Sequence, residues 1–346
     1  MTFRQPGVTI AQYVPPPAGR IPRRGRGAAL GAWLLLSLLA GIPAVEAAPT
    51  ACPQHYPEGV APDITRPALA AQTRELCFRA FAVLHSGVSR TALAAAEHLT
   101  RRRIQQARQL QRDDAFHAED ALPEDERARL SDYARSGYDR GHMAPSGDMP
   151  TAAAQAESFS LANMVPQSPG SNRCLWEGIE STVRNLAMEE GEVWVLTGPI
   201  FEGRNLQRLN GRVLVPTSLY KAIYLPRRGE AGAYVAPNEP GMAWRAVSLD
   251  ELRGIAGLDA FPALPAAVKA RAMTLPEPRP SNVRGSCDDQ PEVAGNTPQG
   301  PRAGQGRAPQ SAPQESSWGG GNTGLILAGL FAVVMVIALY RVLGRR

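Results

Sequence analysis

Residues 136–145, with the sequence SGYDRGHMAP, bring an imidazole, a guanidinium and a glycine together within a few positions. His142 directly follows Arg140 and Gly141, and Pro145 stiffens the chain just beyond them. Histidine has a pKa near neutrality and can accept a proton, and arginine offers a fork of donors that matches a phosphate. Such a segment needs a defined geometry, so we expect the rest of the chain to supply a scaffold around it.

The N-terminal 48 residues have the pattern of an export signal. The apolar run 28–44 follows a basic flank and precedes the small residues around Ala47. This order predicts a secretory signal that is cleaved near Ala47, with an uncleaved signal anchor as the alternative. Residues 1–27 are expected to be irregular.

The C-terminal residues also differ from a globular sequence. Residues 286–321 are rich in Pro, Gly, Gln and Ser and predict a disordered linker, because they cannot bury a core. Residues 322–346 hold an uncharged apolar run long enough to span a bilayer, and the arginines after it favour a cytoplasmic end. The preceding Trp318-Gly-Gly-Gly resembles bacterial sorting tails that an intramembrane protease removes; a plain tail anchor is the alternative. The globular domain is therefore expected at residues 49–285.

The formal net charge of +5 overstates how basic the folded part is. Five arginines precede the first apolar run and three follow the last one. Removing both ends leaves a domain that is not globally basic. Any attraction for a polyanion must therefore come from a local patch of charge.

The four cysteines indicate disulfides rather than a zinc site. They are Cys52, Cys77, Cys174 and Cys287, and none lies in a CxxC pair. In an exported chain an even number favours two bridges. Cys52–Cys77 with Cys174–Cys287 is the preferred pairing of the three; free buried thiols are the alternative in a cytosolic chain.

The first half of the domain predicts mainly strands. Residues 77–85 alternate as a strand does, and Ser86-Gly87 indicates a turn. Residues 89–99 are predicted as a second strand, although their alanines also suit a helix. Residues 100–135 are charged and expected to be rich in loops, with a short helix beginning at Pro123.

The second half predicts a helix followed by further strands. Residues 172–189 carry apolar side chains at helical spacing and end at Gly191. Three apolar stretches predict strands, at residues 193–197 (closed by Gly198-Pro199), 213–215 and 220–225. Residues 248–251 form a capping box that begins a short helix. The fold class predicted is α+β, with a central, mostly antiparallel sheet flanked by helices.

Hydrolysis of a phosphodiester needs a base, neutralisation of the phosphate's charge and stabilisation of the leaving oxygen. His142 is a candidate base, a role that contributes roughly 10²–10⁴ in rate. Mg²⁺ keeps several of its waters and needs only one or two protein oxygens, so a single asparagine can be its direct ligand. Asn163 and Asn172 are the candidates, and Asn172 begins the helix that carries Glu180 and Arg184.

Three motifs in this order resemble the DNA/RNA non-specific endonuclease family, which includes mitochondrial endonuclease G and secreted bacterial sugar-non-specific nucleases. They are Asp139-Arg-Gly-His, Asn163-Met-Val-Pro-Gln and Asn172-Arg-x-x-Trp-x-x-x-Glu. The resemblance covers residues 77–264. It implies a ββα-metal (His-Me finger) active site, in which a strand carries the histidine and a helix carries the metal ligand.

The resemblance also implies a role for each motif residue. His142 is the general base, and Asn172 is the direct ligand of one Mg²⁺ or Mn²⁺. Arg140 and Arg184 contact phosphate, and Glu180 holds metal-bound water. Asn163 positions His142 or a neighbouring loop, and Asp139 is a structural hydrogen-bonding residue. The likeness around Arg112 is too loose to assign that residue a role.

Each of these residues has a simpler structural interpretation. Asn172 could be only a helix N-cap, and Glu180 with Arg184 could be a surface ion pair. A histidine outside such a set would be a structural residue. The three motifs together favour the catalytic interpretation.

The sequence therefore predicts an exported, membrane-tethered endonuclease that cuts DNA and RNA with little sequence preference. It would be periplasmic or at the cell surface, either anchored through its C-terminal segment or released after a sorting protease acts on the tail. The rival is a catalytically inactive nucleic-acid-binding protein on the same scaffold. A zinc hydrolase lacks its ligand cluster, and a homodimer is left open.

Overall fold

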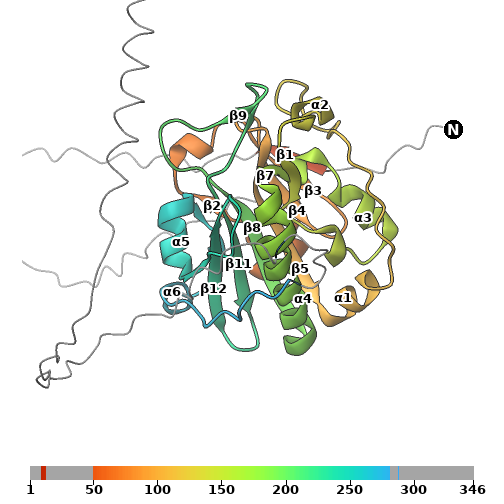
Figure 1. Cartoon of the computed structure of the whole chain (residues 1–346). Coiled ribbons are helices and arrows are strands. Elements are labelled where there is room, and N and C mark those ends of the chain that lie inside the picture. The colour runs from red at the N-terminus through yellow and green to blue at the C-terminus, as the bar shows by residue number, and fades with distance from the viewer. Residues whose placement is uncertain (1–8, 13–49, 281–286, 288–346) are drawn as a thin grey trace, which may run out of the picture. The chain divides into compact units, whose positions relative to one another are not determined.

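The computed structural model describes residues 9–12, 50–280 and 287 (Figure 1). Its centre is an eight-stranded sheet in which every recorded pair of neighbouring strands is antiparallel. In spatial order the strands are β1 (Thr9–Gln12), β3 (Thr73–Cys77), β4 (Ala82–Ser86), β5 (Thr91–Thr100), β8 (Glu192–Ile200), β11 (Ser218–Leu225), β12 (Glu230–Pro237) and β13 (Arg245–Val247). The predicted α+β class is confirmed.

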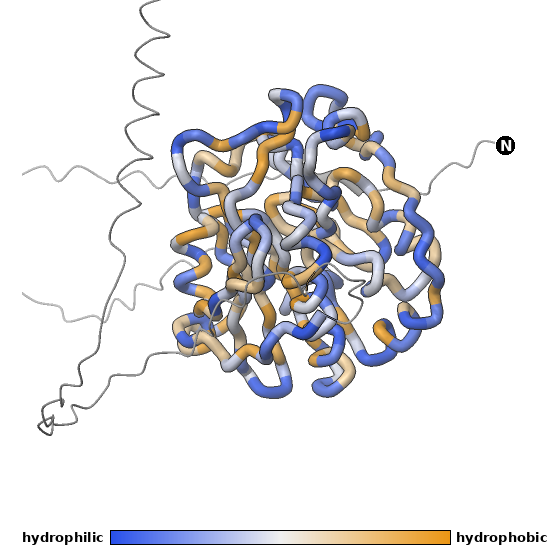
Figure 2. Tube along the Cα trace, viewed as in Figure 1, coloured by the Kyte–Doolittle hydropathy of each residue, from blue (hydrophilic) through white to orange (hydrophobic). Residues whose placement is uncertain are grey.

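The sheet separates two hydrophobic cores. Along β4, Val83 belongs to one core and Leu84 to the other, because successive side chains of a strand point to opposite faces. The first face is covered by α1 (Arg101–Ala107), α3 (Ala152–Ser158) and α4 (Glu177–Glu190), and the second by α5 (Leu249–Ala256). Figure 2 shows the strands as mainly hydrophobic and the outer loops as mainly hydrophilic.

Smaller elements complete the domain. Three two-stranded ladders pair β6 (Asp139–His142) with β7 (Met164–Gln167), β9 (Arg208–Leu209) with β10 (Val213–Leu214), and β2 (Asp63–Ile64) with β14 (Leu258–Asp259). The short helices α2 (Leu130–Tyr133) and α6 (Ala266–Lys269) lie in the connecting segments. A third, small core packs residues of β7, β9 and β10 together.

Both predicted disulfides are confirmed. Cys52–Cys77 joins the N-terminal arm to β3, and Cys52 is fully buried in the core beneath α5. Cys174–Cys287 joins the start of the long helix to residue 287, across a separation of 113 residues. The two bridges therefore serve different parts of the fold.

Several sequence predictions for the first half need correction. Residues 77–85 are not one strand: β3 ends at Cys77, the Phe78 amide donates to the Phe81 carbonyl in a turn (2.9 Å), and β4 begins at Ala82. The predicted strand 89–99 is confirmed as β5, because burial on both faces of the sheet outweighs the helix propensity of its alanines. Pro123 begins only a turn.

In the second half, the predicted helix 172–189 is confirmed but starts as a π-helical turn, Ser171–Trp176, before α4 continues to its end at Gly191. Gly198 does not end a strand. It pairs within β8, where a Cβ would lie 2.3 Å from the Leu93 carbonyl oxygen, so the close approach of β5 requires glycine. The predicted helix after Ser248 is confirmed as α5, and its first turn is capped by the Ser248 side chain.

At the N-terminus, the expectation that residues 1–27 are irregular is wrong at Thr9–Gln12, which pair with β3 as an edge strand. The rest of the predicted signal, the linker and the C-terminal apolar run lie outside the described residues. None of the helices in the described part of the chain has the length and apolar character of a membrane span.

Candidate active site

The β6–β7 ladder and the helix after it form a strand–strand–helix unit. His142, at the end of β6, lies opposite Met164 at the start of β7, and both are buried. The chain then passes through the π-helical turn into α4. His142 and Asn172 therefore come from the strand and helix positions predicted for them.

Asn163 fixes the segment that follows His142. Its side-chain oxygen accepts from the Ala144 amide (2.9 Å), and its side-chain nitrogen donates to the Ala144 and Ser158 carbonyls (2.8 and 2.9 Å). The Asn163 carbonyl also accepts from the Met143 amide at 3.0 Å. The side chain is fully buried. Its position fits the predicted role of positioning the loop next to His142.

His142 lies in an aromatic and cationic setting. Its ring packs edge-on against Phe159, with centroids 5.0 Å apart, and lies 5.6 Å from Phe116. Its Nε2 atom is buried without a partner among the described residues. Burial, and then the positive charges of Arg112 and Arg140, lower the pKa of His142 to about 3. The imidazole is therefore neutral at physiological pH.

Asn172 is oriented by Asp139, the first residue of the DRGH motif. The Asn172 side-chain nitrogen donates to an Asp139 carboxylate oxygen at 3.0 Å, and Arg173 binds the same carboxylate through two hydrogen bonds of 2.9 and 2.8 Å. A carboxylate only accepts hydrogen bonds, so the amide nitrogen of Asn172 must face it. The carboxamide oxygen of Asn172 remains available as a ligand.

Glu180 and Arg184 lie about two and three turns beyond Asn172 along the helix, but they are not the simple surface ion pair of the structural alternative. Arg184 binds Asp148 at 3.1 Å and Glu177 at 3.6 Å, and its side chain is 16% exposed. Burial raises the pKa of Glu180 to about 7, against the opposing charges of Lys221 and Arg184. Glu180 is thus a half-buried carboxylate whose charge is poorly compensated.

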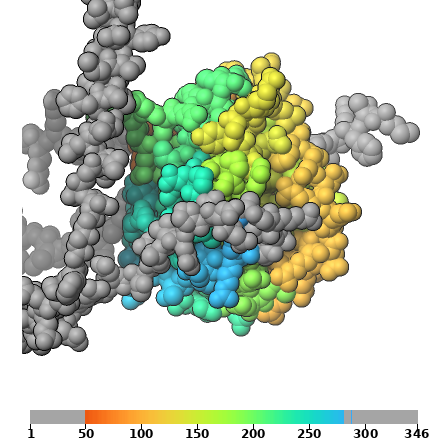
Figure 3. Space-filling view, in the orientation of Figure 1, coloured from red at the N-terminus to blue at the C-terminus, as the bar shows by residue number. Residues whose placement is uncertain are grey.

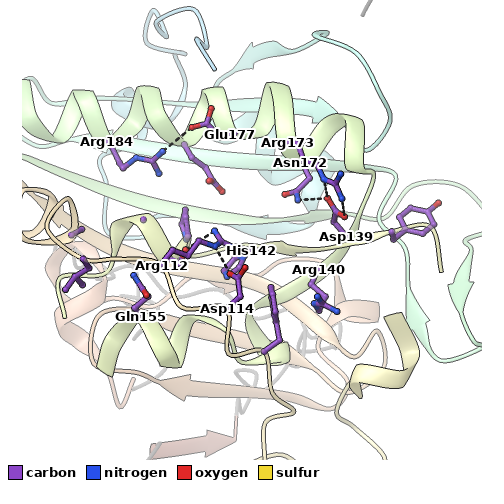
Figure 4. Close-up of a pocket in the computed structure, with 18 residues that line it drawn as sticks. Arg112, Asp114, Asp139, Arg140, His142, Gln155, Asn172, Arg173, Glu177 and Arg184 are labelled. Atoms are coloured by element: carbon purple, nitrogen blue, oxygen red, sulfur yellow. Dashed lines mark hydrogen bonds and ion pairs between the residues drawn. The ribbon is translucent and has the colours of Figure 1, made fainter. Parts of the chain in front are cut away.

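These side chains surround one cleft of about 650 Å³. Figure 4 shows Asn172, Glu177 and Arg184 projecting from the helical side, with Arg112, Asp114 and Gln155 across from them and His142 between. Asn163 is fully buried and is not among the residues that line the cleft. The lining of the cleft includes His142, Asn172, Glu180, Arg112, Arg140 and Arg184.

The comparison with protein families decides what kind of cleft this is. The sequence model described as DNA/RNA non-specific endonuclease matches residues 61–267, which is more than half of the chain. The chain belongs to this family of nucleases.

Relatives within the DNA/RNA non-specific endonuclease family include nuclease C1 of Cunninghamella echinulata var. echinulata, which is 36% identical over 174 residues, 46% of this chain and 69% of that protein. The mitochondrial nuclease EXOG of Danio rerio is 35% identical over 51% of this chain, and that of Homo sapiens is 32% identical over 56% of it. The chain spans only 57% and 58% of these two proteins. A solved EndoG/EndoGI complex has 27% identity and a TM-score of 0.48, over 54% of this chain and 86% of that one.

The cleft of this family member fits a divalent cation. The available Asn172 oxygen and the carboxylates of Glu177 and Glu180 line the same wall, and oxygen is the ligand type that Mg²⁺ and Mn²⁺ prefer. The half-buried carboxylate of Glu180, with its raised pKa, is a group whose charge a cation would compensate. Among the described residues, the close cluster of metal-ligand types is Cys52, Glu75 and Cys77, but it contains a disulfide and lies away from the cleft.

The sequence motifs assigned no role to two residues near the site. Arg112 lies in the cleft wall, donates to Asp114 (2.6 Å) and Ser146 (3.1 Å), and extends over the Phe159 ring. In the sequence, Arg112 is marked only by its position four residues before Phe116, in a segment without regular structure. Asp148 is 2% exposed and holds Arg184; it follows the DRGH motif closely, but nothing in the sequence indicated this contact.

Proposed function

We propose that this protein is an endonuclease that hydrolyses phosphodiester bonds of DNA and RNA without strong sequence preference. The observation that supports this most directly is the convergence of His142, Asn172 and a set of arginines on one cleft. His142 is the general base, and Asn172 is the direct ligand of one Mg²⁺ or Mn²⁺.

His142 supplies the base. Because its imidazole is neutral at physiological pH, it can take a proton from a water as that water's oxygen attacks phosphorus and the bond to the leaving oxygen breaks. The positive charges of Arg112 and Arg140 help to lower the pKa of His142 in the free protein, and the negative charge of a bound phosphate would offset them. Binding of substrate therefore raises the basicity of the ring when it is needed.

The arginines supply the contacts to the phosphate. Arg140 lies with its guanidinium carbon 4.1 Å above the Phe116 ring, and its Nε has no partner among the described residues. Arg112 extends into the same cleft, and Arg184 is held by Asp148 and Glu177. Contacts of this kind read the backbone rather than the bases, which supports action on both DNA and RNA with low sequence preference.

The cation site consists of the Asn172 oxygen, with Glu180 placed to hold the waters of the metal. A bound Mg²⁺ or Mn²⁺ would neutralise charge on the phosphoryl and leaving oxygens. Asp139 orients the Asn172 side chain, and Asn163 fixes the backbone after His142, so the two halves of the site are each held by a separate hydrogen-bonding residue.

The alternative, a nucleic-acid-binding protein without catalysis, has no particular observation in its favour. Such a protein could lose the base or the ligand without penalty, yet both are present and face one cleft. The two disulfides support the prediction that the protein works outside the cytoplasm. Anchoring through the C-terminal segment remains a prediction about residues that the structure does not describe.

A side-by-side digestion tests the proposal. Supercoiled plasmid, single-stranded DNA and RNA are incubated with wild type, His142→Ala and the control His98→Gln, with Mg²⁺, with Mn²⁺ or with a chelator. We expect cutting of all three substrates that needs the metal, a loss of roughly 10²–10⁴ in His142→Ala with binding retained, and little change in His98→Gln. Binding without cutting by the wild type would establish the inactive alternative, and equal cutting by His142→Ala would refute the assigned base.

A further inference from the structure

The described chain continues beyond the family match, which ends at residue 267, as a segment that packs on α4. We call residues 273–280 the C-terminal strap. It begins on β12, where the Met273 amide donates to the Ala231 carbonyl (2.8 Å), and Tyr234 donates to the Pro276 carbonyl (2.7 Å). Met273 and Leu275 are buried in the core beneath α4.

From there the strap follows the helix toward the active site. Pro276, Glu277 and Arg279 line a cleft of about 250 Å³ together with α4 residues between positions 182 and 189. Nearer the start of the helix, a Cβ on Gly178 would lie 3.0 Å from the Pro280 nitrogen, so glycine there permits the strap to touch the helix. Figures 1 and 3 show this blue segment at the surface, next to the green of α4.

The Cys174–Cys287 disulfide attaches the segment after the strap to the N-terminal end of the same helix. Cys174 is 1% exposed and lies in the π-helical turn, two residues after Asn172. The Cys287 sulfur also lies 3.9 Å from the carbonyl oxygen of Arg173. The bridge therefore contacts the backbone at the residue between Asn172 and Cys174. Residues 281–286 lie outside the described part of the chain.

The turn that carries the proposed metal ligand is held by packing, by hydrogen bonds and by this disulfide. Its residues Ser171, Cys174, Leu175 and Trp176 are buried, and Arg173 binds the Asp139 carboxylate. A π-helical turn is rare, and this one begins without a side-chain cap at Gly170. The side chain of Asn172 is held by Asp139 and its amide donates to the Ser168 carbonyl (2.8 Å). The disulfide is the one covalent restraint among the described residues of this turn.

We infer that the Cys174–Cys287 disulfide and the C-terminal strap are positioning elements of the metal site, so that the nuclease binds its divalent cation tightly only in the oxidised state. The inference rests on the proposed function, because it takes Asn172 as the metal ligand. Reduction leaves the strap anchored on β12 but frees residue 287 and the π-helical turn from each other.

The redox step is an ordinary thiol–disulfide exchange. One cysteine thiolate attacks a low-molecular-weight disulfide such as oxidised glutathione, a mixed disulfide forms and one glutathione leaves. The second cysteine then displaces the other glutathione. Overall the protein loses two protons and two electrons, and two glutathione thiols form. A nuclease without sequence preference would thus gain metal affinity only after it leaves a reducing compartment.

The test compares Cys174→Ser/Cys287→Ser with Cys52→Ser/Cys77→Ser in the full-length protein. The second pair is a matched control, since it also removes one bridge that has a buried cysteine but lies in the core on the other side of the sheet. Mn²⁺ affinity is measured by electron paramagnetic resonance, and the Mg²⁺ dependence of plasmid cutting is measured in parallel. We expect the metal Kd to rise about tenfold in the first variant, in the range seen when partners of metal ligands are removed, and to change less than twofold in the control.

A second experiment reduces and reoxidises one folded protein, so that a misfolded variant cannot account for the result. In the Cys52→Ser/Cys77→Ser background, dithiothreitol should weaken Mn²⁺ binding and oxidised glutathione should restore it, while circular dichroism shows the fold unchanged. Equal metal affinities for the two double variants, or for the reduced and oxidised protein, would overturn the inference even if the wild type cuts nucleic acid. A redox-dependent Mn²⁺ affinity in a wild type that cuts nothing would instead overturn the proposed function and leave the metal-site inference standing.

Discussion

Asp139 accepts a hydrogen bond of 3.0 Å from the side-chain nitrogen of Asn172, and this contact fixes which atom of the carboxamide faces the cleft. The two residues are 33 positions apart, one at the start of β6 and the other in the π-helical turn. The first residue of the DRGH motif therefore acts on the proposed metal ligand. Without it, the Asn172 amide can turn its nitrogen toward the cation.

This relationship predicts that Asp139→Ala weakens metal binding more than catalysis. The Kd for Mg²⁺, taken from the metal dependence of plasmid cutting, should rise about tenfold, because loss of an orienting partner costs metal ligands roughly that much. The rate at saturating Mg²⁺ should fall far less. Arg173→Ala is the control, since it removes the other partner of Asp139 but keeps the hydrogen bond to Asn172. Equal effects of the two substitutions would show that Asp139 works through its ion pair instead.

A second prediction separates two roles of Arg184. In Arg184→Ala the nearly buried carboxylate of Asp148 loses its ion-pair partner, which should lower the free energy of unfolding by about 3 kcal/mol. Adding Asp148→Ala should recover much of that stability, because the unpaired charge is gone. Cutting should stay low in both variants if Arg184 contacts phosphate. Recovery of activity together with stability in the double variant would instead assign Arg184 a purely structural role.

The third prediction concerns the protonation of His142. Because burial and two arginines lower its pKa to about 3, the ring should stay neutral down to about pH 5 in the free protein. A nuclear magnetic resonance titration of the imidazole should show this directly. Arg140→Ala removes one of the positive charges and should raise the pKa. An unshifted pKa near 6.5 in the wild type would mean that the ring is more exposed to water than its packing against Phe159 indicates.

The fourth prediction is that the buried His85 makes the stability of the fold depend on pH. It is fully buried, its Nε2 is within 3.0 Å of the Glu126 carbonyl, and burial lowers its pKa to about 4. The unfolded chain binds a proton near pH 6.5 while the folded chain does not, so stability is lost as the pH falls from 6.5 toward 4. At about 1.4 kcal/mol per pKa unit, the loss is about 3 kcal/mol. Urea titrations should show a weaker pH dependence in His85→Gln; an unchanged dependence would assign it to other groups.

The sequence predicted the site better than the elements around it. Three motifs indicated a candidate base and a candidate ligand that line one cleft, since the chemistry of phosphate and cation restricts which side chains can serve. The hairpin turn at Phe78–Phe81 was missed because its apolar residues continue the strand pattern, and only pairing with β4 shows where the chain reverses. The alanines of β5 were ambiguous for a related reason, since their conformation is decided by burial between two cores.

Residues that act through contacts distant in sequence were the hardest to predict. Asp148 is recognisable only from the position of Arg184, 36 residues away, and Arg112 lies in a loop that has no periodic pattern. The disulfides were easier, because four cysteines allow only three pairings and export favours bridges. Only the fold shows that Cys52–Cys77 lies at the core beneath α5 and that Cys174–Cys287 lies at the start of the long helix.

Gly141, in the middle of the DRGH motif, provides the last prediction. A Cβ at this position would lie 2.1 Å from the side-chain oxygen of Gln167 and 2.6 Å from its Cβ, and Gln167 is fully buried on the facing strand. Gly141→Ala should therefore cost about 1–3 kcal/mol of stability, as overpacking does, and should lower cutting by displacing His142 on the same strand. Gly254→Ala, on α5 with nothing within 4 Å of the new methyl, is the control and should be neutral or stabilising. Gly141→Ala/Gln167→Gly removes both contacting groups and should restore much of the activity. If it does not, the requirement for glycine at position 141 arises from the backbone or from the substrate rather than from Gln167.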